Sequence, residues 1–221
     1  MSVTIREQTE QVKAASAERL PAEVLAVFDQ SIQNLLEKGV PDDAIKVGDT
    51  LESFSLDDAT GTPVTLESLV EAGPAVVVFY RGGWCPYCNV ALRTYQRELL
   101  PELAGFGARL VAISPQTPDQ SLSTVEKAEL EFTVLSDPGS RVALRIGIAF
   151  QQADEVLDAQ RKLGLDLTQV NAEGLVNLPR PTVLIVDTDR TVRFVDVQPD
   201  YTARTEVADI IAALTGLASE R

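Results

Sequence analysis

The sequence predicts an α/β protein in which a central β-sheet with crossover connections is flanked by helices. Apolar segments of strand length alternate along the chain with segments whose leucines and aromatics recur at helical spacing. The most apolar of these strands, within residues 75–80, stops at Gly82-Gly83, and a helix begins a few residues later. Strands and helices that alternate in this way indicate a layered sheet.

Two helices are predicted ahead of the sheet, so residues 1–47 are expected to form an N-terminal helical extension. The first helix, within residues 1–20, is polar and carries only a sparse apolar stripe. The second begins at Pro21 and ends at Gly39, two residue types that favour these positions. Its apolar face must pack on the main domain or on a second subunit, so a homodimer is one of the arrangements that the sequence allows.

The main domain is expected over residues 48–221, and strands and helices alternate in its first part. The predicted strands lie before a turn at residues 57–61, near Val64, and at residues 76–80, 109–114 and 132–135. The predicted helices lie at residues 67–71, after Cys88, and at residues 118–130 and 141–146. The helix after Cys88 should kink or end at Pro101, because proline cannot donate a helical hydrogen bond.

Residues 151–179 interrupt this alternation and are expected to form an insertion. One helix in it ends at Gly164, and the remainder is irregular. A long segment of this kind near the end of a compact domain is either an active-site cover or an ordinary surface excursion. After it, strands at residues 183–187 and 192–197 are expected to pair as an antiparallel hairpin, and a last helix stops near Gly216.

The composition excludes several classes of function. The chain of 221 residues has a net charge of −14, which argues against binding to nucleic acid or to an anionic membrane. It has no histidine, which rules out Cys–His and Ser–His catalysis and the usual metal centres. The first ten residues lack the features of a signal peptide, and no apolar run approaches the ~20 residues of a membrane helix, so a cytoplasmic location is expected.

The only two cysteines of the chain, Cys85 and Cys88, open the helix that follows the central strand. Unpaired backbone N–H groups and the positive pole of the helix dipole meet at this end. A thiolate there is stabilised, and its pKa is expected to fall from ~8.5 toward neutrality. Pro86 stiffens the turn and removes one of these N–H donors. Two cysteines three residues apart can also close a disulfide, so the pair is suited to reversible oxidation.

Two other interpretations of the cysteines are a zinc site and a pair of inert core thiols. Zinc sites normally need four ligands, and here only carboxylates or a second chain could complete one. Inert core thiols would leave the double glycine and Trp84, just before the cysteines, without a purpose. Redox chemistry is therefore the preferred interpretation, and no metal or other cofactor is expected.

The order of these segments resembles the thioredoxin fold over residues 48–217: a strand, Trp-Cys-Pro-x-Cys at a helix start, a crossover, then Pro-Thr before a hairpin and a last helix. The resemblance implies a thioredoxin-like fold with a central mixed sheet. It also implies that Pro181, before Thr182, is a cis-proline against the dithiol, and that Trp84 shields the sulfurs. The same Pro-Thr pair could instead begin a strand with a trans bond. The buried acid of thioredoxins would fall at Phe79, so their proton shuttle is missing and general protein-disulfide reduction is less favoured.

Within that superfamily the chain resembles the AhpC/TSA peroxiredoxin-like group whose members carry Cys-x-x-Cys. In the peroxiredoxin pattern, the peroxidatic cysteine falls on Cys88, while the family's proline and threonine fall on Arg81 and Cys85. Residues 132–139 also resemble the peroxiredoxin stretch in which an apolar strand meets Ser-Asp-Pro. The family's arginine, which orients the peroxide and holds the thiolate, is expected at Arg180, with an offset of about one residue, and Arg81 is a second candidate.

The resemblance implies a thiol peroxidase that reduces hydrogen peroxide or organic hydroperoxides and is regenerated by a thioredoxin-like protein. The peroxiredoxin register makes Cys88 the nucleophile, and the thioredoxin register makes it Cys85, the more exposed of the pair. The sequence leaves this choice open. Two alternatives also stay open: a thiol–disulfide oxidoreductase, and a non-catalytic, redox-responsive interaction module that uses the N-terminal helices and the insertion.

Overall fold

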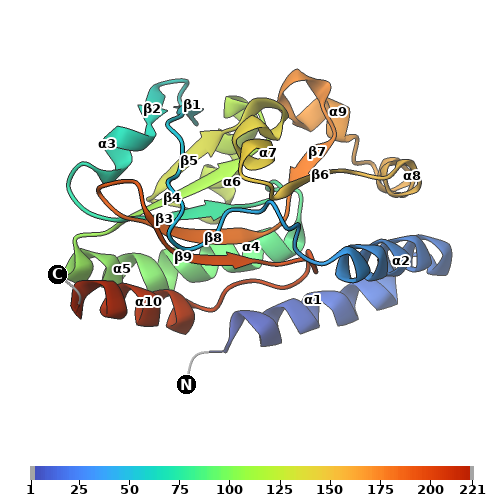
Figure 1. Ribbon diagram of the computed structural model, residues 1–221. Coiled ribbons are helices and arrows are strands. Elements are labelled where there is room, and N and C mark those ends of the chain that lie inside the picture. Colours follow the sequence, from blue (N-terminus) through green and yellow to red (C-terminus); the bar gives the residue numbers. More distant parts are fainter. Residues whose placement is uncertain (1–2, 220–221) are drawn as a thin grey trace.

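The computed structural model describes residues 3–219 and shows a mixed sheet with helices on both faces (Figure 1). The order of the main sheet is β2-β1-β5-β4-β3-β8-β9, and β6 and β7 form a separate two-stranded sheet. The strands are β1 (Ser55–Asp58), β2 (Pro63–Thr65), β3 (Ala75–Phe79), β4 (Arg109–Ser114), β5 (Thr133–Ser136), β6 (Ala149–Gln151), β7 (Asn177–Pro179), β8 (Thr182–Val186) and β9 (Val192–Val197). The predicted fold class is confirmed.

Ten α-helices are present within residues 3–219. They are α1 (Ile5–Arg19), α2 (Ala22–Lys38), α3 (Leu66–Val70), α4 (Pro86–Thr94), α5 (Leu100–Leu103), α6 (Pro118–Ala128), α7 (Arg141–Arg145), α8 (Asp154–Lys162), α9 (Leu167–Val170) and α10 (Val207–Ser219). In this part of the chain no helix combines the length and the hydropathy that crossing a lipid bilayer would require.

The central strand β3 is buried along its whole length because the sheet is covered on both faces. It pairs in parallel with β4 and antiparallel with β8, which makes the sheet mixed. Its side chains alternate between two cores. Val76, Val78 and Tyr80 pack on the side of α4 and α10, where the two cysteines also lie, whereas Val77 and Phe79 pack with α3 and α7. A strand that is buried on both faces has a continuous run of apolar residues, which is the pattern of residues 75–80.

The helix after the cysteines changes from α to π just before Pro101, where the sequence predicts a kink or an end. α4 passes into a π-helical turn, Tyr95–Leu99, and α5 then begins at Leu100. The backbone N–H of Leu100 donates to the carbonyl of Tyr95, five residues earlier. A wider turn of this kind accommodates the proline, which has no N–H to donate.

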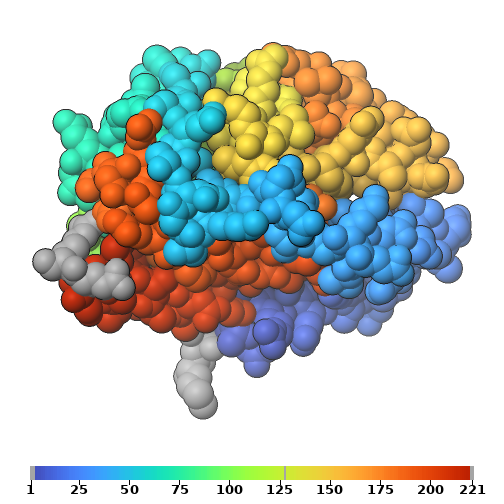
Figure 2. Space-filling model, viewed as in Figure 1, coloured from blue at the N-terminus to red at the C-terminus, as the bar shows by residue number. Residues whose placement is uncertain are grey.

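Both N-terminal helices pack against the rest of their own chain. α1 runs along α4, and α2 packs against α8 of the insertion. Figure 2 shows the golden residues of α8 lying directly on the blue residues of α2. α1 starts with a capping box between Thr4 and Glu7, and the N–H groups of Ile5 and Arg6 donate to the carboxylate of Glu206 at 3.0 and 2.9 Å. The extension is therefore tied to the segment that leads into α10.

Three details differ from the sequence prediction. The irregular part of the insertion contains α9 and ends in β7, which pairs with β6, because short strands without alternating polarity carry little sequence signal. α10 continues beyond Gly216 to Ser219, since the glycine lies in open surroundings that impose no turn. The cis-proline that the resemblance implies is wrong, and the alternative, a trans strand start, is what the structure shows. No peptide bond among residues 3–219 is cis, and the trans Pro181 continues the extended chain from β7 into β8.

Candidate active site

The dithiol lies where β3 ends and α4 begins, as the sequence predicts. Cys85 is the N-cap of α4 and Pro86 is its first residue. Both sulfur-bearing side chains are buried, with exposed fractions of 1% for Cys85 and 0% for Cys88. The approach of the chain to this turn requires Gly82. Its φ is +142°, and a Cβ there would lie 2.4 Å from Nε1 of Trp84. The glycine thus lets the indole ring lie on the backbone beside the cysteines.

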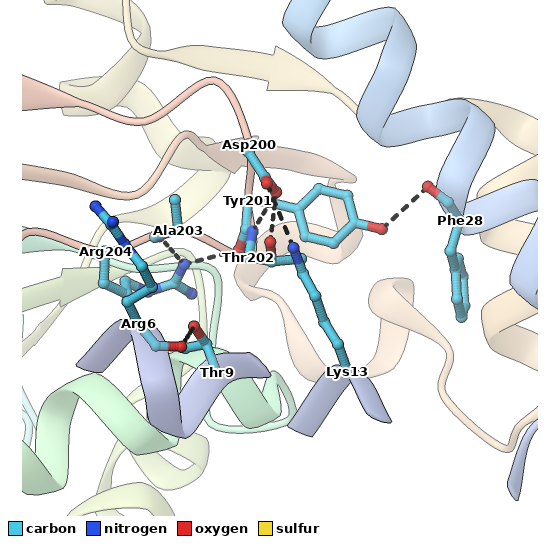
Figure 3. A network of polar contacts seen from close by, with 9 residues as sticks. All are labelled: Arg6, Thr9, Lys13, Phe28, Asp200, Tyr201, Thr202, Ala203 and Arg204. Carbon is cyan, nitrogen blue, oxygen red and sulfur yellow. Dashed lines mark hydrogen bonds and ion pairs between the residues drawn. The ribbon is translucent and has the colours of Figure 1, made fainter. Parts of the chain in front are cut away.

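Arg204 is the cation that contacts the sulfurs. Its Nη2 lies 2.9 Å from Sγ of Cys88 and 3.8 Å from Sγ of Cys85. The other guanidinium nitrogen, Nη1, donates to the backbone carbonyls of Tyr201 and Ala203, which fixes the direction of the group. Figure 3 shows how this segment, between β9 and α10, folds around the arginine. Arg204 was not predicted, because no sequence pattern links it to cysteines more than a hundred residues earlier in the chain.

The two thiols have opposite pKa shifts. Burial works against ionisation of Cys88, but the hydrogen bond from the Cys85 thiol and the charge of Arg204 hold the pKa of Cys88 well below its usual range. The backbone N–H of Arg81 contributes in the same direction. Burial and the neighbouring Cys88 thiolate raise the pKa of Cys85 well above its usual range. These directions favour the thiolate on Cys88 and the thiol on Cys85.

Arg81 is brought to the site, as the sequence predicts, but in a different role from Arg204. Its guanidinium lies between two aromatic rings, 5.0 Å from the centroid of Trp84 and 4.1 Å from that of Tyr201. Its Nη2 donates to Oε1 of Gln152 in the insertion at 3.1 Å. The side chain is 3% exposed. Arg81 therefore adds positive charge beside the sulfurs while joining the motif to the insertion.

The structure does not bring Arg180 to the sulfurs. Its guanidinium lies 5.3 Å from the ring centroid of Phe150, and burial lowers its pKa. Its backbone N–H donates to the carbonyl of Ile148, which extends the pairing of β6 with β7 by one hydrogen bond. Its side chain lies beside Phe150 of β6. Pro181 and Thr182 do lie beside Cys88, where they line a small enclosed space together with Arg204. The contact with the sulfur that was predicted for Arg180 is thus made by Arg204, which comes from a later segment of the chain.

A cleft of about 850 Å³ opens over the other sulfur, and we name it the Cys85 cleft. Its floor is formed by the motif residues Trp84, Cys85 and Tyr87 together with Tyr201. Its walls come from α1, α2 and α8, so the N-terminal extension and the insertion both enclose it. Cys88 does not line this cleft but borders the enclosed space, of about 10 Å³, on the other side.

The segment that holds Arg204 also holds the walls of the cleft in place. The hydroxyl of Tyr201 donates to the backbone carbonyl of Phe28 in α2 at 3.4 Å, and Nζ of Lys13 in α1 lies 3.6 Å from a carboxylate oxygen of Asp200 (Figure 3). The side chain of Asp200 also accepts hydrogen bonds from the N–H and hydroxyl of Thr202. One short segment therefore connects the cation at the sulfurs to both N-terminal helices.

A buried dithiol at a helix start, beside the central strand of a mixed sheet and paired with a guanidinium, defines a thiol oxidoreductase of the thioredoxin-fold class. The model of the AhpC/TSA family matches residues 47–195, and the chain belongs to that family. The match ends before Arg204 and begins after α2, so it includes neither the cation at Cys88 nor two walls of the Cys85 cleft.

The similar proteins are peroxiredoxins. Over 104 residues the chain is 32% identical to peroxiredoxin Bcp of Escherichia coli, which covers 47% of this chain and 65% of that protein. It is 33% identical over 101 residues to the chloroplastic peroxiredoxin Q of Sedum lineare, covering 46% and 53%. The crystal structure of peroxidoxin BcpB from Mycobacterium tuberculosis matches with a TM-score of 0.62 and 28% identity, over 80% of this chain and 99% of that one. The chain is thus a peroxiredoxin-like oxidoreductase.

Proposed function

We propose that the protein is a thiol peroxidase in which Cys88 attacks the hydroperoxide and Cys85 resolves the product to a disulfide. The contact between Nη2 of Arg204 and Sγ of Cys88, at 2.9 Å, carries this proposal. A guanidinium at this distance stabilises the thiolate, which is the nucleophilic form, and offers a donor to an incoming peroxide oxygen. This assignment agrees with the peroxiredoxin register, in which Cys88 occupies the position of the peroxidatic cysteine.

Cys85 supplies the proton that the first step needs. The Cys88 thiolate attacks the outer oxygen of ROOH, so that an S–O bond forms and the O–O bond breaks. The leaving alkoxide takes the proton of the Cys85 thiol and departs as ROH. Cys88 is then a sulfenic acid and Cys85 a thiolate, which attacks the sulfur of Cys88. An S–S bond forms, hydroxide leaves, and the dithiol has given two electrons to the peroxide.

A dithiol donor of the thioredoxin type is the proposed reductant of this disulfide, and the cytoplasm is the compartment in which such a cycle would run. A thiol–disulfide oxidoreductase is the less favoured alternative. The enclosed space at Cys88 is small, which favours a peroxide oxygen over a protein disulfide as the group that Cys88 attacks, whereas Cys85, which lines the open cleft, is the sulfur that a reductant can reach once the disulfide has formed.

Single cysteine variants test the assignment. Reduced Cys85→Ser should still form a sulfenic acid on Cys88 when hydrogen peroxide is added, detected with a dimedone-type probe and mass spectrometry. Cys88→Ser should react no faster than a free thiol. The reverse result would make Cys85 the nucleophile, and slow reaction of the wild type would refute the peroxidase.

Rapid mixing with the wild type adds a kinetic test. Trp84, the only tryptophan of the chain, adjoins Cys85 and reports on both steps. A phase whose rate depends on peroxide concentration should come first, followed by one that does not, because disulfide closure is intramolecular. The second phase should be missing in Cys85→Ser.

A further inference from the structure

Arg180 is a buried cation whose side-chain hydrogen-bond donors are not used. The residue is only 4% exposed, yet its guanidinium makes no hydrogen bond or ion pair within the part of the chain that the structure describes. Its Nε is fully enclosed, whereas Nη1 and Nη2, also without partners, are not. The guanidinium lies over the ring of Phe150, which offers no acceptor oxygen. Since buried arginines are ordinarily paired, this group is suited to an acceptor from outside the chain.

A second cleft, of about 490 Å³, reaches Arg180, and we name it the Arg180 cleft. One side of it is formed by α2, and the other by β6 and the start of α8, which packs beside α2 (Figure 1). Its lining shares only Val156 with the Cys85 cleft and includes neither cysteine. Its volume is within the range of about 300–1,000 Å³ that is common for small-ligand sites.

The charges around the Arg180 cleft favour an anion with a single charge. Lys38 lines the cleft as a second cation, whereas Glu155 lines it as an anion and Asp43 lies close enough to act on the charge of Arg180. These two acids offset part of the positive potential, so a dianion is less favourable there than a monoanion. A carboxylate has one charge, and its two oxygens match two nitrogens of a guanidinium.

The first turn of α8 adds to this attraction. Its N-cap, Ala153, lines the cleft and has no side-chain acceptor for the N–H groups of the helix start. Those N–H groups and the positive pole of the helix dipole favour a carboxylate oxygen. Asp154 and Glu155 of the same turn reduce this effect, so the buried guanidinium remains the main attraction.

The rest of the lining indicates what is attached to the carboxylate. Val27 and Leu35 of α2 and Phe150 of β6 supply apolar surface, and Ser31 and Asn34 supply polar groups. Phe150 is also the ring beside the guanidinium, so apolar surface and positive charge adjoin each other in the cleft. A compact molecule with an apolar body and one carboxylate matches this arrangement.

We propose that the Arg180 cleft is a second ligand site, which binds a small monocarboxylate through the guanidinium of Arg180 and packs its apolar body against Phe150 and α2. The site is distinct from the dithiol. Gln152 connects the two, because it lines the Arg180 cleft and accepts a hydrogen bond from Arg81 at 3.1 Å. Since α2 lies outside the residues that match the family model, one wall of this site belongs to the N-terminal extension.

Two fluorinated probes of nearly the same shape test the class of ligand. para-Fluorobenzoate and para-fluorobenzamide share the ring, and only the benzoate is charged. In fluorine NMR titrations of the reduced protein, the benzoate should bind saturably with a Kd of about 1 mM or lower. The amide should bind at least about tenfold more weakly, because charge-assisted hydrogen bonds are stronger than neutral ones. No saturation by about 10 mM benzoate, or equal affinities for the two probes, would overturn the proposal.

A first pair of variants tests whether Arg180 holds the carboxylate. Arg180→Met removes the cation and keeps much of the side chain's length. Arg141→Met makes the same change on α7, at a side chain that is 65% exposed and lies outside the cleft. The affinity for para-fluorobenzoate should fall at least about tenfold in Arg180→Met and stay unchanged in Arg141→Met. Unchanged affinity in Arg180→Met, or an equal loss in both variants, would overturn the proposal.

A second pair tests the wall formed by α2 and decides the matter if Arg180→Met does not fold. Asn34→Asp adds a negative charge in the cleft with almost no change of shape, and its oxygen can still accept from Gln30. Gln33→Glu adds the same charge one position earlier on α2, on the side of the Cys85 cleft. Asn34→Asp should weaken benzoate binding at least about threefold, and Gln33→Glu should not. Equal affinities in the two variants would contradict the site.

Inorganic phosphate tests the charge of the ligand. It should displace para-fluorobenzoate at least about threefold less effectively than unlabelled benzoate does, because Glu155 and Asp43 oppose a second negative charge. Equal or better displacement by phosphate would overturn the assignment to a monocarboxylate. None of these titrations uses a peroxide, so their outcome is independent of whether the dithiol is a peroxidase.

Discussion

The two cysteines lie three residues apart, yet their surroundings differ in almost every physical respect. Cys88 borders a small enclosed space and contacts the guanidinium of Arg204, whereas Cys85 forms part of the floor of a large apolar cleft. The surroundings of Cys88 therefore favour a thiolate, and Cys85 is the sulfur that lines the open cleft. A Cys-x-x-Cys motif thus does not assign equal roles to its sulfurs, because neighbours from distant segments make the distinction.

The largest effect is expected when the charge on the Cys88 side is removed. Arg204→Met leaves the thiolate without its cation, and breaking a buried charged pair costs about 3–5 kcal/mol. The pKa of Cys88 should rise, and the rate with peroxide at neutral pH should fall by about 100-fold or more. Stopped-flow kinetics and the ultraviolet absorbance of the thiolate measure the two effects. Arg97→Met, at an arginine whose side chain is 63% exposed, is the control. If Arg204→Met reacts with peroxide as fast as the wild type, Arg204 does not distinguish Cys88 from Cys85.

A smaller loss is expected at the boundary between the two regions, where Arg81 lies between Trp84 and Tyr201. Arg81→Lys keeps the positive charge but loses the planar group that stacks on the rings, which is worth about 0.5–2 kcal/mol. The peroxide rate should fall about fivefold to tenfold, and the emission of Trp84 should shift. If the emission shifts while the rate stays the same, Arg81 only packs there.

The opposite pKa shifts of the thiols predict how stability of the reduced protein depends on pH. Cys88 has a lowered pKa in the folded state, so its contribution is complete above the unfolded value of ~8.5 and is lost as the pH falls through the folded value. Cys85 has a raised pKa, and its contribution is lost as the pH rises above ~8.5. Thiol ionisation should therefore stabilise the protein most near that pH. Urea unfolding of the wild type and of Cys88→Ser at a series of pH values measures this dependence. Below pH ~8.5 the free energy of unfolding should rise more steeply with pH in the wild type, and equal slopes in the two proteins would contradict the prediction.

The smallest effect on the reaction is expected at Arg180, which contacts Phe150 instead of the sulfurs. Arg180→Ala should change the peroxide rate by less than about twofold. Loss of the contact with the ring should lower the free energy of unfolding by about 1 kcal/mol. Urea denaturation and stopped-flow kinetics measure the two quantities. A rate loss above about tenfold would place Arg180 back at the dithiol and would weaken the case for Arg204.

Local sequence patterns predicted most of the fold. The valine-rich run of β3, the helix start at Cys85 and Pro86, and the β8–β9 hairpin all follow from apolar periodicity and turn residues, and each is present. At Pro101 the sequence predicts a kink or an end because proline has no N–H to donate, and the structure instead has a π-helical turn before it and a helix that continues through it. The pairing of β6 with β7 could not be predicted, since each strand has three residues and finds its partner across the whole insertion.

The candidate site was predictable only in part. The two sulfurs and Arg81 come from one stretch of sequence, and the structure brings them together. The second cation was predicted at Arg180 because it lies near the expected family position, but the structure places its guanidinium over the ring of Phe150. Arg204 reaches the sulfurs after β9 has ended, a relation that only the folded chain creates.

The sequence by itself determined that this is an α/β protein with a reactive dithiol at a helix start, because strand and helix periodicity and the dipole of a helix act over a few residues. Only the tertiary structure decided which sulfur contacts a guanidinium and which lines the cleft. Both properties depend on burial and on charges within a few ångströms, and the groups that supply them, Arg204 and the N-terminal helices, are more than forty positions from the cysteines along the chain.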